Sequence, residues 1–170
     1  MEKTQDLTLS EIKQILPDQV MSSLADDFII STFDSLAETK NALYYPSRID
    51  GFAFIYVVKG SLDIESNLKT FCVGPGEGFV YVPGNISMVK SVVHPLKCVF
   101  VAVSKSLISE LQFDFTKLYE ESFSVLENPC IRIDERAKEI GRQYYSLITT
   151  ILESGMEALK NTEVDRKAIK

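Results

Sequence analysis

Between Phe28 and Ser104 the chain consists of short apolar runs that are cut by turn residues at intervals of roughly ten positions. This pattern is typical of antiparallel β structure, in which short strands are joined by tight turns. We expect eight strands, near residues 28–34, 40–45, 52–58, 61–66, 69–73, 78–82, 86–93 and 97–103. Eight short strands within about 75 residues predict a barrel or jelly roll.

The sequence changes character on both sides of this region. Residues 1–27 are only weakly periodic and predict an N-terminal arm, and residues 28–103 form the predicted barrel. Residues 104–170 predict helices, two short ones and a longer third one that begins after the N-cap residue Asp134 and ends at Gly155. The fold class predicted is therefore mainly β, with a C-terminal α-helical appendage.

The third predicted helix carries a seam of apolar or aromatic side chains. Their spacing is 4, 3, 4, 3, 4, which is an a/d pattern kept for almost three heptads: Ile133, Ala137, Ile140, Tyr144, Leu147 and Ile151. Such a seam either packs on the chain's own barrel or pairs with a second copy. For a homodimer, the predicted interface residues are Ile140, Tyr144, Leu147 and Ile151.

The composition restricts which partners the chain can bind and in which cellular compartment it is expected. The 24 acidic residues outnumber the 18 basic ones, giving a net charge of −6, so this segment is a poor candidate for direct contact with DNA phosphates. The N-terminus lacks the apolar core of a signal peptide, and the longest apolar runs, 53–58 and 98–103, are too short to span a bilayer. Three widely spaced cysteines suit reduced thiols, so a cytoplasmic location without membrane contact is expected.

The barrel region resembles the two sequence motifs of cupins. Gly60 fits the glycine that closes the first motif, and Gly76 and Gly84 fit the second. The metal-binding positions are replaced: Ala53 stands for the glutamate, and Ser87 stands for the histidine of the second motif. The two histidines of the first motif fall on Ser47 and Ile49 or, with the alternative spacing, on Pro46 and Arg48.

A cupin metal site needs several imidazoles and usually a carboxylate. The chain has a single histidine, His94, which precedes Pro95 in a predicted turn. We therefore expect no metal and no cofactor, and the sequence has no nucleophile elbow or phosphate-binding loop of another enzyme class. The prediction from the sequence is that the chain is not an enzyme.

A cupin barrel followed by helices is similar to the N-terminal sensor and dimerisation domain of AraC-type transcription regulators. The resemblance covers roughly residues 28–152. It implies a homodimer, a small-molecule effector, an N-terminal arm that closes over it, and DNA binding only through a C-terminal helix-turn-helix domain. That domain is absent from this chain, which we expect to be cut before it. The alternatives are a stand-alone cupin enzyme, a metal-free small-molecule-binding cupin and a structural cupin that only mediates assembly.

The same resemblance suggests where a ligand would lie. Beside a sugar-binding member of the family, Val89, Cys98 and Phe100 fall near ligand-contacting strand positions and Tyr45 near an arginine position. Ser87 takes the place of a metal ligand, and Arg48 is a charged group near the barrel mouth that could fix a carboxylate or phosphate. These six residues are the predicted ligand-binding set. Because most are apolar, they suit a sugar poorly, and a barrel filled by its own side chains is the other possibility.

Overall fold

The computed structural model describes residues 3–16, 20–34, 42–111 and 115–168. The chain divides into two units, residues 1–133 and residues 134–170. The first holds the sheet and three short helices, and the second is a single helix.

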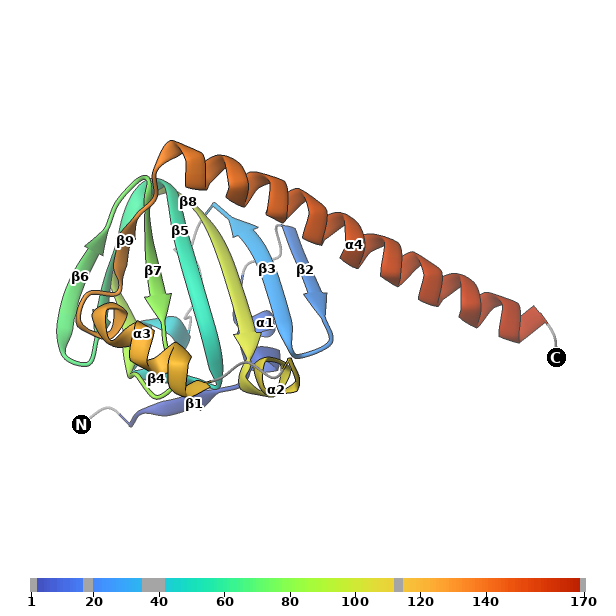
Figure 1. Cartoon of the computed structure of the whole chain (residues 1–170), viewed down its shortest axis with the longest axis horizontal. Coiled ribbons are helices and arrows are strands. Elements are labelled where there is room, and N and C mark those ends of the chain that lie inside the picture. Colours follow the sequence, from blue (N-terminus) through green and yellow to red (C-terminus); the bar gives the residue numbers. More distant parts are fainter. Residues whose placement is uncertain (1–2, 17–19, 35–41, 112–114, 169–170) are drawn as a thin grey trace. The chain divides into compact units, whose positions relative to one another are not determined.

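The first unit is built around a nine-stranded sheet whose strands pair mostly antiparallel (Figure 1). The main path of paired strands is β1-β4-β8-β5-β7-β9; β3 pairs with β8 and β2, and β6 pairs with β5. The strands are β1 (Gln5–Leu7), β2 (Val20–Leu24), β3 (Phe28–Phe33), β4 (Ser47–Ile49), β5 (Gly51–Ser66), β6 (Lys69–Val73), β7 (Glu77–Tyr81), β8 (Ser87–Ser104) and β9 (Cys130–Arg132). The predicted fold class, a mainly β cupin-like barrel with C-terminal helices, is confirmed.

The strands are longer and fewer than expected within the barrel. The predicted turns at 59–60 and 94–95 both lie inside continuous strands, β5 and β8, which pair with each other. The ladder between these strands is irregular at three points, including both sides of Lys59. Bulges let a long strand bend without ending, so turn-forming residues can remain inside it.

Two further expectations for the barrel differ from the structure. Within the strand expected at 40–45, the described residues Ala42–Tyr44 form a 3₁₀ turn (η1), and residues 40 and 41 lie outside the described residues. His94 lies in β8 rather than in a turn, although it is exposed as expected.

The N-terminal segment contributes directly to the first unit. β1 pairs in parallel with β4, and β2 pairs with β3 along five residues. Between them α1 (Leu9–Ile15) begins with a capping box, in which Thr8 Oγ1 accepts from the Glu11 N–H and a Glu11 carboxylate oxygen accepts from the Thr8 N–H. Leu9 and Ile12 of this helix are buried in the barrel core.

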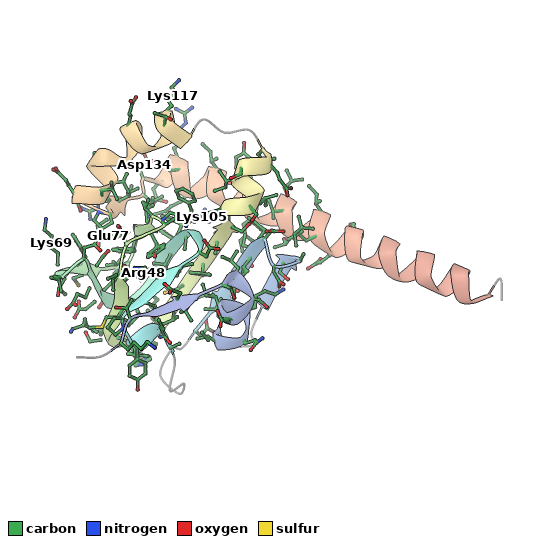
Figure 2. The ribbon with its side chains drawn as sticks, turned by 90° about the horizontal axis from the view of Figure 1, so that it is seen from below. Arg48, Lys69, Glu77, Lys105, Lys117 and Asp134 are labelled. Atoms are coloured by element: carbon green, nitrogen blue, oxygen red, sulfur yellow. The ribbon has the colours of Figure 1, made fainter. Side chains whose placement is uncertain are left out.

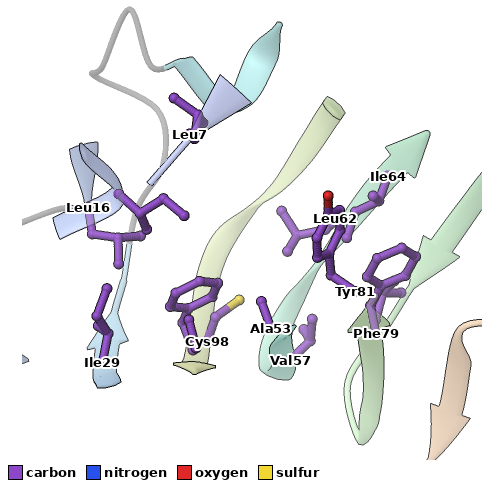
Figure 3. Close-up of a cluster of buried hydrophobic side chains, with 14 of the residues drawn as sticks. Leu7, Leu16, Ile29, Ala53, Val57, Leu62, Ile64, Phe79, Tyr81 and Cys98 are labelled. Atoms are coloured by element: carbon purple, nitrogen blue, oxygen red, sulfur yellow. The ribbon is translucent and has the colours of Figure 1, made fainter. Parts of the chain in front are cut away.

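The core is one cluster of apolar side chains from α1 and the strands of the barrel (Figure 3). Its fully buried members are Ile12, Ile29, Val57, Leu62, Val73, Cys98 and Ala102. Ser31 is equally buried, and its hydroxyl is the one buried side-chain oxygen or nitrogen among the described residues that has no hydrogen-bond partner. Such an unpaired polar group weakens the fold.

Replacing Ser31 with alanine is therefore expected to raise the free energy of unfolding by about 1 kcal/mol, since it removes a buried hydroxyl without a partner. Urea denaturation of the two proteins measures the difference. The neighbouring exchange Thr32→Ala, on the opposite face of the same strand, serves as the control. A loss of stability in Ser31→Ala would show that the hydroxyl has a partner in solution.

Two short helices and a longer third one follow the barrel, as predicted. α2 (Lys105–Glu110) is capped by Ser104, and α3 (Phe115–Glu127) is followed by Asn128 and Pro129. In α4 (Glu135–Ala168) the N-cap role of Asp134 is confirmed, because its carboxylate accepts from the Ala137 N–H at 2.7 Å. The predicted end at Gly155 is wrong, and the helix continues for another 13 residues since nothing after this glycine blocks the backbone hydrogen bonds.

Candidate functional site: an apolar cavity in the barrel

The barrel contains a cavity of about 90 Å³ that is partly open to the surface. Its walls come from α1's C-terminal end, from η1 and from strands β4, β5, β7 and β8. The lining residues are Leu16, Leu43, Ser47, Ile49, Ala53, Phe54, Ile55, Ile64, Phe79, Tyr81, Ser87, Met88, Val89 and Phe100. Eleven of these fourteen side chains carry no oxygen or nitrogen, so the cavity is almost wholly apolar.

The three polar side chains in the lining already have partners for their hydroxyl hydrogens. Ser47 donates to the Tyr45 carbonyl at 2.8 Å and accepts from the Gln5 side-chain amide at 2.9 Å. Ser87 donates to the Ser66 hydroxyl at 3.0 Å. A ligand in this cavity would therefore find few groups with which to form hydrogen bonds.

Tyr81 is the third polar group, and it connects β4 to the turn between β7 and β8. Its hydroxyl donates to the Asn85 carbonyl at 2.6 Å and accepts from the Ile49 N–H at 2.8 Å. Burial raises the pKa of Tyr81 above its ordinary value, so the phenol stays protonated and keeps donating at neutral pH. The side chain holds the chain segments beside the cavity in place rather than offering a free group to a ligand.

The six residues of the predicted ligand-binding set do not all meet at this cavity. Ser87, Val89 and Phe100 line it. Cys98 is fully buried in the core but is not part of the lining. Tyr45 is half exposed and lies outside the cavity.

Arg48 also lies outside the cavity, on the barrel surface (Figure 2). It is exposed, and its guanidinium lies 3.8 Å from the Asp6 carboxylate on the adjacent strand β1. Lys105 and Asp50 form a second ion pair at 3.2 Å in the same surface groove. Because each of these two cationic side chains has an acidic partner, neither Arg48 nor Lys105 leaves an unpaired positive charge in the groove.

Strand alternation correctly predicted part of the cavity lining, but it failed beyond the irregularity in the pairing of β5 with β8. With Ala53 and Ser87 taken as inward positions, alternation predicts that Ile55, Val57, Val89, Ser91 and Val93 face the interior. Ile55 and Val89 line the cavity, and Val57 is buried in the core but is not part of the lining. The prediction is wrong for Val93 and Ser91, which are exposed, and the Ser91 hydroxyl donates to Asp63. The ladder steps from Ile64↔Val89 to Asp63↔Ser91, so one extra residue of β8 reverses the alternation there.

Sequence reasoning missed lining residues that come from outside the barrel strands. Leu16 follows α1 and Leu43 lies in η1, and both reach the cavity from segments with no strand periodicity. Figure 3 shows Leu16 in the same interior cluster as Ala53 and Phe79. The only sequence signal for Leu16 is the amphipathic pattern of residues 9–16, which predicts a buried face without showing what it covers.

Burial raises the pKa of Cys98 to about 12. Because the thiolate is the reactive form, Cys98 should resist alkylation by iodoacetamide at mildly alkaline pH in the folded protein. Exposed Cys72 serves as the internal control and should be modified first. Peptide mass spectrometry with and without urea measures both sites, and equally fast modification of Cys98 in the native protein would contradict its burial.

The described residues contain no cluster of three or more His, Cys, Asp and Glu side chains that could hold a metal ion. In the part of the chain that the structure describes, no helix has the length and apolar character needed to cross a membrane.

The predicted dimer residues are all on α4. Ile140, Tyr144, Leu147 and Ile151 have exposed fractions of 45%, 61%, 55% and 59%. They recur every three or four positions and so share one side of the helix. The stripe that the sequence predicts is therefore present on a continuous helix, and its role in pairing stays a prediction.

Comparison with known proteins gives structural neighbours only. No protein-family profile matches the chain, and no curated protein matches it. Among solved structures, KdgF from a Halomonas species is 18% identical, with a TM-score of 0.37 over 52% of this chain and 80% of that one. A candidate mannose-6-phosphate isomerase from Ralstonia eutropha JMP134 is also 18% identical, with a TM-score of 0.36 over 52% of this chain and 87% of that one.

A third neighbour is oxalate decarboxylase from Bacillus subtilis, 12% identical, with a TM-score of 0.36 over 59% of this chain and 24% of that one. These likenesses concern the cupin-type fold and carry no substrate or activity over to this chain. They do correct one prediction. The inference that the chain is not an enzyme is withdrawn, because enzymes are among the structures it matches. Missing histidines argue against one kind of metal site, and catalysis does not depend on that kind of site alone.

Proposed function

We propose that the chain is the ligand-sensing and dimerisation domain of an AraC-type transcription regulator. The observation that carries the proposal is the combination of parts in one chain. A cupin-type barrel with an apolar cavity is followed by a 34-residue helix with a repeating apolar stripe. A cavity can bind an effector, and a helical stripe can join two copies so that two DNA-binding segments reach two half-sites.

In this proposal DNA contact belongs to a segment other than these 170 residues. The acidic excess of the chain, 24 residues against 18 basic ones, disfavours binding to phosphates. The N-terminal residues support the sensing role, because Leu16 contributes to the cavity wall while Leu9 and Ile12 anchor α1 in the core. A ligand in the cavity would therefore contact Leu16, which follows α1 directly.

The test of the dimerisation half is the association state of the purified chain at micromolar concentrations. Light scattering is expected to give twice the mass of one chain. A monomer at these concentrations would overturn the proposal, since nothing would then join the two copies of the regulator.

A second candidate function is a metal-free cupin that binds a small molecule without acting in transcription. The cavity favours this candidate independently of α4. The two candidates differ in their need for α4. A small-molecule-binding cupin would bind its ligand and function even as a monomer, whereas a regulator domain requires the dimer.

A further inference from the structure

The chemistry of the cavity wall restricts what it can bind. A ligand hydroxyl, amine or carboxylate must find a partner inside the barrel, or its burial costs roughly 1–3 kcal/mol for each unpaired group. The hydroxyl hydrogens of Ser47, Tyr81 and Ser87 are already donated, to Tyr45, Asn85 and Ser66. The described lining residues therefore leave no side-chain donor for a polar ligand, and carry no charge at all.

The size of the cavity sets a second restriction. Its volume is about 90 Å³, whereas sites for drug-sized ligands run to roughly 300 Å³ or more. A dry apolar cavity of roughly 150 Å³ takes up benzene or xenon, so a smaller one accepts a ligand of about six non-hydrogen atoms or fewer.

From these two restrictions we propose that the barrel binds a small, uncharged, apolar molecule without hydrogen-bonding groups, such as a short or cyclic hydrocarbon. Ala53 sets the space that this ligand occupies. It has the smallest side chain of the lining residues, and it lies on β5 between the β7 and β8 strands that carry Tyr81 and Phe100. The inference rests on the proposed function in taking the barrel as the ligand-binding part of the chain.

The test uses the purified full chain with benzene and xenon as probes, and glycerol as a polar molecule with the same number of non-hydrogen atoms as benzene. Benzene is expected to raise the melting temperature in a saturable manner, and xenon to shift the NMR signals of methyl groups in the cavity wall. Glycerol at the same concentrations is expected to do neither. Saturable binding of glycerol in the cavity, or binding of neither apolar probe, would overturn the inference.

Ala53→Val locates the site by adding two methyl groups to the cavity wall. It should weaken benzene binding by about tenfold or more, the usual effect of extra methyl groups in an apolar pocket. Thr70→Val, an exposed position on β6 outside the cavity, is the matched control and should leave the affinity unchanged. Unchanged affinity in Ala53→Val would place the binding elsewhere and overturn the inference. If Ala53→Val does not fold, the wild-type NMR shifts decide the location, since signals of Val89 and Ile64 must move.

The dimer measurement keeps the two proposals apart. A dimer that binds neither apolar probe overturns the ligand class and leaves the regulator proposal in place. A monomer that binds benzene at Ala53 overturns the regulator proposal and supports the ligand class.

Discussion

Replacing Gly60 with alanine is expected to lower the free energy of unfolding by at least about 3 kcal/mol, one of the largest effects available from a single methyl group. Gly60 has a φ of +77°, in the left-handed region that side chains disfavour. A Cβ at this position would lie 2.4 Å from the Val93 carbonyl oxygen and 2.7 Å from that of Pro95. Both oxygens belong to the backbone of β8, so relief requires the two central strands of the barrel to separate. Chemical denaturation measures the loss.

Gly84→Ala is the matched control for this prediction. Gly84 also has a positive φ, +94°, but a Cβ there would meet nothing within 4 Å. It should therefore show only the backbone strain, about 1–2 kcal/mol. If the two variants lost the same stability, the close approach of β8 to Gly60 would not exist in solution.

The double change Leu147→Glu with Ile151→Lys is expected to turn a dimer into a folded monomer. Charges placed in a buried seam without partners across it cost several kcal/mol, which exceeds what a short helix pairing can supply. Within one copy the new glutamate and lysine are four residues apart on α4 in the favourable order, so the helix itself should be kept. Light scattering reports the mass and circular dichroism reports the fold.

Ser146→Glu with Thr150→Lys introduces the same two charges, also four residues apart, at exposed positions of the same helix outside the stripe. This control should remain a dimer. If the double variant at 147 and 151 stays dimeric, the stripe is not part of the interface. If it unfolds, these side chains are needed for the fold of a single copy.

Much of the barrel could be predicted because its signals are local. The apolar runs that became β3, β6, β7 and the two halves of β5 and β8 are read from neighbouring residues, and strand alternation is a property of the backbone alone. The same holds for the start of α4, where the side chain of Asp134 bonds to the backbone three residues later. The cavity wall was predicted only in part, at Ala53, Ile55, Ser87, Val89 and Phe100.

What remained unpredicted depends on contacts between distant segments. The bulge that turns Ser91 outward exists because β8 must follow the bend of β5, and this pairing joins residues far apart in the chain. Leu16 and Leu43 reach the cavity only through the packing of α1 and η1. Arg48 lies on the outer face of β4, because Ser47 and Ile49 on either side of it line the cavity. The sequence alone thus determined most of the barrel strands, the start of α4, the lack of imidazoles and the stripe on α4, since these depend on composition or on residues within a few turns of one another. Tertiary packing alone decided which side chains enclose the cavity and which hydroxyls are already bonded, because both depend on strands and helices that meet only in the folded barrel.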